Sequence, residues 1–117
     1  MYNGIITVRS SSSRLKNKCF LKINDLMVIE HVILRCLHGN IKPIICTSKN
    51  KEDKKLVKIA KDFGIEFFQG SLQNKIKRWY DCARTKKIKF FHTIDADDPF
   101  FDYVAVKESL DLLKKNK

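Results

Sequence analysis

A run of hydroxyl and basic side chains follows the first apolar segment of the chain. Arg9, Arg14 and Lys18 enclose four consecutive serines at positions 10–13. Backbone N–H groups, hydroxyls and cationic side chains gathered in one loop can hold an anion that carries several negatively charged oxygens. Such a loop suits a polyphosphate, but the same composition also suits a solvated basic turn. The loop on its own leaves both interpretations open.

A cluster of carboxylates follows the last predicted strand. Asp95, Asp97 and Asp98 stand just before Pro99. Carboxylates can hold Mg²⁺ against the phosphates of a nucleotide, whereas Asp residues before a proline can also form a simple turn. If the strands that precede the basic loop and this cluster are neighbours in a parallel sheet, the two sets of side chains face each other. Together they would then suit a nucleoside triphosphate with a divalent metal.

Apolar and amphipathic segments alternate along the chain and predict an α/β fold. The predicted strands are residues 4–8, 41–47, 65–68 and 89–94, and the predicted helices are residues 27–37, 51–63, 70–83 and 104–113. Asn50 and Gly64 would cap the second helix, and Ile76, Trp79 and Tyr80 are expected in the core. Four strand–helix units with right-handed crossovers predict a parallel, doubly wound sheet in the order 3-2-1-4, with ligands beyond the carboxyl ends of its strands.

Composition limits the classes of partner. The 117 residues fit one domain or part of one, and 24 Lys and Arg against 13 Asp and Glu give a net charge of +11. This excess favours anionic partners such as nucleic acid or phosphorylated small molecules. Four scattered cysteines without a C-x-x-C pair predict a reducing, cytoplasmic location, and no stretch is long enough for a membrane span. Neither a Walker A motif nor G-x-G-x-x-G is present, which disfavours P-loop and dinucleotide sites.

Several segments resemble, in order, the motifs of the CMP-sugar synthetases, which are cytidylyltransferases of the spore-coat-polysaccharide and acylneuraminate types. Residues 8–18 resemble A-R-x-x-S-x-R-L-P-x-K, residues 29–33 L-E-H-V-I, residues 47–53 T-S-D-N-x-E-D, residues 68–71 F-R-G-S, residues 78–80 R-Y-Y, and residues 94–102 I-T-G-D-C-P-L-I-D. Lys16 stands where the family pattern has Pro, and Ala96 stands where it has Gly. The resemblance covers nearly the whole chain.

The resemblance implies a fold and an activity. The fold would be a three-layer α/β/α, Rossmann-like parallel sheet of the nucleotide-diphospho-sugar transferase type. Residues 1–117 would be its N-terminal, nucleotide-binding part, truncated after the fourth strand–helix unit. The implied reaction transfers CMP from CTP to an acidic sugar and releases pyrophosphate, for surface polysaccharide biosynthesis. A homodimer is one expected outcome of the apolar surface that an incomplete domain exposes.

The resemblance also implies roles for individual residues. The first loop would hold the triphosphate of CTP, with Arg9 and Lys18 as the catalytic cations. Asp97 would bind Mg²⁺. The full set of implied nucleotide-binding residues is Arg9, Ser11, Ser12, Arg14, Lys18, Ser48, Gly70 and Ser71, of which the last three would lie near the base and ribose.

Three functions remain open at this point. The first is an active cytidylyltransferase, and the second is a catalytically incomplete nucleotide-binding fragment or remnant of the same family. The third is a basic nucleic-acid-binding domain, which rests on the net charge of +11 alone. The acidic cluster at the predicted site and the lack of interleaved aromatic and basic residues argue against this third function.

Overall fold

The computed structural model describes residues 2–8, 18–71 and 73–116. Its main sheet has four parallel strands in the order β5-β4-β1-β6. The strands are β1 (Tyr2–Thr7), β4 (Ile41–Ser48), β5 (Glu66–Gly70) and β6 (His92–Asp95). In sequence order this arrangement is 3-2-1-4, so the predicted topology is confirmed.

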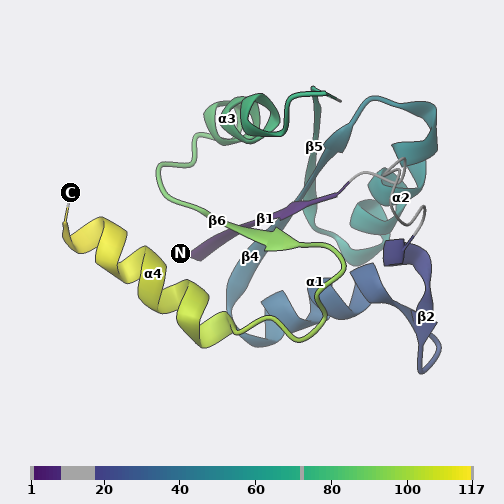
Figure 1. Ribbon diagram of the computed structural model, residues 1–117, viewed down its shortest axis with the longest axis horizontal. Helices are drawn as coiled ribbons and strands as arrows, with labels where there is room; N and C mark the ends of the chain where they lie inside the picture. The colour runs from purple at the N-terminus through teal and green to yellow at the C-terminus, as the bar shows by residue number, and fades with distance from the viewer. Residues whose placement is uncertain (1, 9–17, 72, 117) are drawn as a thin grey trace.

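Helices cover both faces of the sheet and form the outer layers of the fold (Figure 1). They are α1 (Val28–His38), α2 (Lys54–Phe63), α3 (Lys75–Thr85) and α4 (Tyr103–Lys115). Side chains of α1, α2 and α4 pack with the sheet in the larger apolar cluster. Cys82 of α3 packs with Ile5, Ile44 and Cys46 in the smaller cluster on the other face. The central strands β1 and β4 are therefore buried on both sides, which is why each carries consecutive isoleucines.

The predicted end of the second helix at Gly64 is confirmed, whereas Asn50 caps the 3-10 turn before this helix and the N-cap of α2 itself is Asp53. The side chain of Asn50 accepts a hydrogen bond from the backbone N–H of Glu52 at the start of the 3-10 turn η2 (Lys51–Asp53), which leads into α2. Gly64 ends α2 in the left-handed region with φ 68°, where glycine is favoured. At the end of α1 the left-handed residue is Asn40 (φ 60°), whereas Gly39 has φ −86°.

The start of α3 differs from the prediction. Gly70 is the last residue of β5, and the helix begins five residues later, because the side chain of Asn74 accepts a hydrogen bond from the N–H of Lys77 at 2.9 Å. Ile76 and Tyr80 are consequently 73% and 61% exposed. Their expected place in the core was wrong, and Trp79 is only half-buried.

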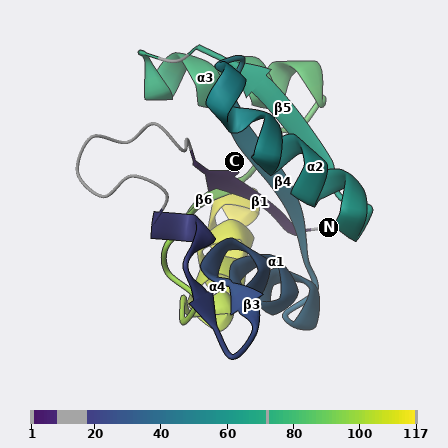
Figure 2. The same ribbon diagram turned by 90° about the vertical axis from the view of Figure 1, so that its right-hand side faces the viewer.

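A short hairpin between the basic loop and α1 was not predicted. It follows the 3-10 turn η1 (Lys18–Phe20) and pairs β2 (Lys22–Ile23) with β3 (Leu26–Met27), as Figure 2 shows beside α1. Asn24 and Asp25 form its two-residue turn with φ of 53° and 70°. An Asn-Asp pair between short apolar segments is a recognisable signal for such a turn.

None of the helices that the structure describes is long and apolar enough to cross a membrane.

Asp102 is expected to stabilise α4 through its side chain. One carboxylate oxygen accepts hydrogen bonds from the N–H groups of Val104 and Ala105, both at 3.0 Å. Replacing an N-cap residue by alanine costs about 1 kcal/mol of folding free energy. Urea unfolding should therefore show this loss for Asp102→Ala, while Glu108→Ala on the exposed side of the same helix should change stability by less than about 0.5 kcal/mol. Equal effects of the two substitutions would contradict the capping role.

Glu66 should make stability depend on pH in the acid range. Its carboxylate contacts Lys42 (Nζ–Oε2 2.6 Å) and Lys86 (Nζ–Oε1 3.2 Å), and the bond to Lys42 is the main reason that the pKa of Glu66 lies below its ordinary value of 4.5. A lowered pKa stabilises the fold above 4.5, and this stabilisation is lost as the pH falls through the folded-state pKa.

NMR titration should therefore find Glu66 protonating below pH 4.5, and Lys42→Met should move that midpoint upward. The stability difference between wild type and Glu66→Gln should be largest near neutral pH and should shrink under acid. A Glu66 midpoint at or above its ordinary value would contradict the role of the two lysines.

Candidate functional site

The carboxyl ends of the four strands meet at one edge of the sheet. Thr7 of β1 is paired in register with Cys46 of β4 on one side and Asp95 of β6 on the other. Ser48 and Gly70 are partners in the pairing of β4 with β5. The segments that follow β1 and β6 therefore leave the sheet side by side, as the order 3-2-1-4 requires.

The far end of the basic loop meets the acidic cluster. Lys18 Nζ lies 3.3 Å from Asp97 Oδ2, and both side chains are nearly half exposed. A pair with this exposure contributes little to stability because water and salt screen it. The pair is informative because of where it lies. It brings a cation and a carboxylate that are 79 positions apart in the sequence into contact at this edge of the sheet. The structure thus brings together two of the residues predicted for the site.

Part of the predicted loop cannot be placed. Arg9, Ser11, Ser12 and Arg14 lie outside the described residues, so their roles stay predictions. The described members of the predicted set are Lys18, Ser48, Gly70, Ser71 and Asp97.

The acidic cluster combines a turn with an available carboxylate. The N–H of Asp98 donates to the carbonyl of Asp95 at 3.2 Å, and Asp98 Oδ1 accepts from the N–H of Phe100 at 3.2 Å. Ala96 is buried beneath the turn. The simple turn foreseen for this segment is therefore formed by Asp95 and Asp98, and the exposed carboxylate of Asp97 is left to face Lys18.

Ser48 has its hydrogen bonds inside the protein. Its hydroxyl donates to the buried carboxylate of Asp53 and accepts from the N–H of Asn50 at 3.1 Å. Its carbonyl accepts from Gln69 Nε2 at 3.3 Å. These contacts fix the end of β4 against the turn before α2. The Ser48 hydroxyl is thus already engaged, and the position of Ser48 beside a base or ribose stays a prediction.

Gly70 and Ser71 lie at the carboxyl end of β5. A Cβ atom at Gly70 would lie 2.7 Å from Phe68 Cε2 and 3.1 Å from Arg78 Cγ, so a larger residue would force a rearrangement. Ser71 Oγ accepts from the N–H of Asn74 at 3.1 Å, and the Ser71 carbonyl accepts from Arg78 Nη1 at 3.0 Å. Contacts with Asn74 and Arg78 therefore hold Ser71 in place at the strand edge.

Arg78 is a residue at this edge that sequence reasoning did not assign. It is 2% exposed, and its Nη2 donates to Thr7 Oγ1 at 3.3 Å. The segment containing it had been singled out through its likeness to R-Y-Y, but no pattern in the sequence indicated that the guanidinium would be buried. Cations are rarely buried, which is why residue type alone points the other way.

Cys19 lies close to the acidic side of the site. Burial is the main reason that its thiol pKa rises to about 11, and the negative charges of Asp53 and Asp97 raise it further. A thiol with this pKa stays protonated near neutral pH and is a poor nucleophile. Cys19 is thus a packing residue and not a candidate for covalent chemistry.

Few protein ligands for a metal ion lie at this edge among the described residues. The described residues contain no group of three or more His, Cys, Asp or Glu side chains able to hold one. Mg²⁺ is commonly bound by one or two carboxylates together with water and substrate phosphates. The exposed carboxylate of Asp97 fits that mode of binding, because a metal ion held by phosphate oxygens could replace Lys18 as its neighbour.

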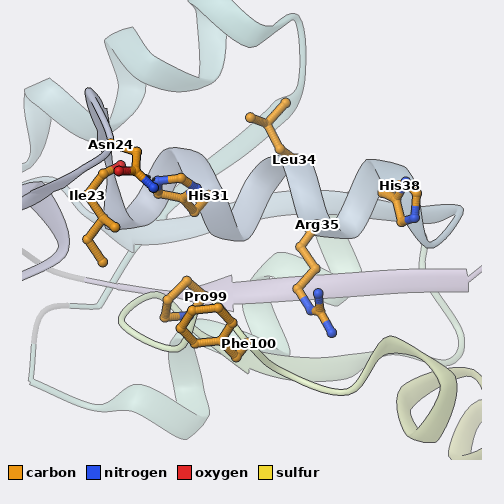
Figure 3. A pocket seen from close by; sticks show the side chains of 8 residues that line it. All are labelled: Ile23, Asn24, His31, Leu34, Arg35, His38, Pro99 and Phe100. Atoms are coloured by element: carbon orange, nitrogen blue, oxygen red, sulfur yellow. Dashed lines mark hydrogen bonds between the residues drawn. The ribbon is translucent and has the colours of Figure 1, made fainter.

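An open pocket of about 380 Å³ lies elsewhere, between α1 and the segment containing Phe100 (Figure 3). Polar groups on its α1 side are already engaged. His31 Nε2 is 2.6 Å from the carbonyl of Ile23, and Arg35 Nε donates to the carbonyl of Phe101. The pocket therefore offers mainly apolar surface and is not the site at the strand ends.

Comparisons with known proteins agree with the fold and the motif order. A family model described as cytidylyltransferase matches residues 3–117. The chain is 30% identical over 116 residues to an uncharacterized protein of Methanocaldococcus jannaschii, a match that covers 97% of the chain and 47% of the relative.

Two solved structures superpose on the chain. A cytidylyltransferase from Leptospira borgpetersenii serovar Hardjo-bovis gives a TM-score of 0.85 at 26% identity, covering 99% of this chain and 50% of that one. CMP:2-keto-3-deoxy-manno-octonic acid synthetase, solved in complex with CTP, gives 0.77 at 18% identity, covering 98% and 48%.

The chain thus spans about half the length of the relatives it matches. The predicted α/β fold is confirmed by these neighbours, and the resemblance read from the ordered motifs is confirmed by the family match. Because that match extends from residue 3 to residue 117, the chain belongs to the cytidylyltransferase family.

Proposed function

We propose that the chain binds CTP with Mg²⁺ at the carboxyl edge of its sheet and forms the nucleotide-binding half of an enzyme that transfers CMP to an acidic sugar. The observation that carries this proposal is the contact between Lys18 and Asp97, which joins the cationic and acidic halves of the predicted site. Family membership supports CTP as the nucleotide. A structural neighbour was solved in complex with CTP, which supports the same ligand at the level of the fold.

The residues at this edge would act by position and charge. Arg9, Arg14 and Lys18, with the hydroxyls of Ser11 and Ser12, would hold the triphosphate, and Asp97 would hold Mg²⁺ against it. The bound metal would supply charge neutralisation at the phosphate oxygens. An oxygen of the sugar attacks the α-phosphorus of CTP, the bond from that phosphorus to the bridging oxygen breaks, and pyrophosphate leaves with that bonding electron pair. Such a transfer needs alignment and electrostatic stabilisation, and no covalent nucleophile on the protein.

Lys18 would change partners when the nucleotide binds. Its ammonium group faces Asp97 in the structure, but a triphosphate offers it more negative charge than one carboxylate does. Transfer of Lys18 to the phosphates would release the Asp97 carboxylate for the metal. The same pair of residues would thus serve both halves of the ligand, with Arg9 and Lys18 as the cations nearest the reaction.

The setting of this activity follows from the chemistry of the chain. We place it in the cytoplasm, since Cys19, Cys36, Cys46 and Cys82 are free and buried, as expected of a protein in a reducing compartment. The product would serve surface polysaccharide biosynthesis.

A second function from the same family has its own support. The chain spans about half the length of its relatives, which suits a nucleotide-binding fragment or remnant that does not turn over by itself. It differs from the first proposal in that the chain alone would not bind the acceptor sugar. The residues that bind this sugar would lie in the half of the relatives that the chain does not match.

Isothermal titration with CTP and Mg²⁺ tests the nucleotide site. Wild type should bind, and Asp97→Asn should weaken binding by about tenfold or more, because a hydrogen-bonded charge is lost at the ligand. Asp98→Asn is the matched control, since the asparagine oxygen can still accept the hydrogen bond from Phe100 while the charge is removed one position away. Absence of heat for wild type, or equal losses in the two variants, would contradict the proposed site.

Pyrophosphate release separates the two functions. We expect the isolated chain to bind CTP but to release pyrophosphate from it poorly with acidic sugars, if the acceptor pocket belongs to the second half. A coupled assay across a panel of acidic sugars, with the full-length Leptospira cytidylyltransferase for comparison, measures this. Sustained turnover by the isolated chain would refute the remnant and establish the enzyme.

A further inference from the structure

Arg78 is the only buried cation in the part of the chain that the structure describes. Its side chain leaves α3, passes Gly70 and ends between the strand ends of the candidate site. There Nη1 donates to the Ser71 carbonyl at 3.0 Å and Nη2 to Thr7 Oγ1 at 3.3 Å. Both acceptors are neutral groups, and each belongs to a segment that leaves the sheet at its carboxyl edge.

None of the ion pairs found among the described residues includes Arg78. Its Nε is buried with no hydrogen-bond partner in that part of the chain. Burying an unpaired cation is costly, so such a group is usually retained where a negative charge comes close to it. Thr7 stands two residues before Arg9, where the predicted triphosphate loop begins.

We infer that Arg78 is a positioning residue of the nucleotide site whose buried charge attracts the triphosphate from beneath the strand ends. This inference rests on the proposed function. Thr7 and Ser71 hold the guanidinium in place, so the charge is fixed before the ligand arrives and needs no reorganisation. Because the group is shielded from water, salt screens it less than it screens Lys18. Arg78 does not itself touch the ligand.

Two substitutions separate charge from packing. Arg78→Lys and Arg78→Gln both lose the fork that spans Thr7 and Ser71, but only the lysine keeps the charge. Arg84→Gln on the exposed side of the same helix is the control for loss of a positive charge. Affinities for CTP are measured by titration at a temperature where circular dichroism shows each variant to be folded.

We expect Arg78→Lys to bind CTP about tenfold more tightly than Arg78→Gln, and Arg84→Gln to stay within about threefold of wild type. Equal affinities of Arg78→Lys and Arg78→Gln would overturn the inference, because packing alone would then explain the residue. A loss for Arg84→Gln as large as that for Arg78→Gln would also overturn it, since net charge would be sufficient. If Arg78→Gln does not fold, Arg78→Met replaces it in the same comparison.

Measuring the binding of inorganic tripolyphosphate distinguishes a failure of this inference from a failure of the proposed function. If wild type binds tripolyphosphate but not CTP, and Arg78→Gln weakens that binding more than Arg78→Lys does, the inference holds and the proposed nucleotide fails. If CTP binds equally to both variants, the proposed function holds and the inference fails. Binding of neither anion by wild type overturns both.

Discussion

The pairing of β1 with β4 on one side and β6 on the other is the constraint on which the rest of the structure depends. Ile5 and Ile6 of β1 are fully buried on opposite faces, so the strand can neither shift by one residue nor leave the sheet without exposing apolar surface. The register then sets Thr7 beside Asp95. The contact of Lys18 with Asp97 follows from that alignment, because the basic loop and the acidic turn begin within three residues of it.

Charged side chains at this edge of the sheet lie both at the surface and in the interior. Lys18 and Asp97 lie at the surface, where water and salt reduce the energy of their interaction and allow each to exchange partners. Arg78 is buried, in a position that its hydrogen bonds to Ser71 and Thr7 fix. The exposed pair can therefore adapt to a ligand, while the buried cation provides a constant positive potential. A site for a highly charged ligand benefits from both, since attraction and exchange require different environments.

Much of the fold could be predicted from the sequence, because it depends on sequence patterns that are compatible with few structures. Continuous apolar segments indicated buried parallel strands, and Asn50 and Gly64 marked helix ends through local hydrogen bonding and backbone geometry. The meeting of the basic loop with the acidic cluster followed from strand order alone, and the contact of Lys18 with Asp97 confirms it.

Other features were decided by competition between similar local signals. Ser71 and Asn74 are both good capping residues, and the structure uses Ser71 to accept from Asn74 and Asn74 to begin α3. In the resulting helix Ile76 is exposed and Arg78 is buried. A sequence pattern gives the helical period but not its starting phase. The burial of Arg78 and the internal hydrogen bonds of Ser48 therefore became visible only with the tertiary contacts.

The fold holds the cationic half of the site more firmly than the acidic half. This difference determines how each half would respond to a bound ligand. The cationic half begins at β1, which has a strand on each side and is joined to α3 through Thr7 and Arg78. The acidic half follows β6, a strand of four residues that pairs only with β1 in the described part of the chain. Besides the strand pairing with β1, its contact with the cationic half is an exposed ion pair worth at most about 1 kcal/mol. Little energy therefore opposes a movement of the Asp97 side chain, and a phosphate-bound divalent cation would attract that carboxylate more strongly than Lys18 does. The cationic half would set the position of the triphosphate, and the acidic half would adjust to it.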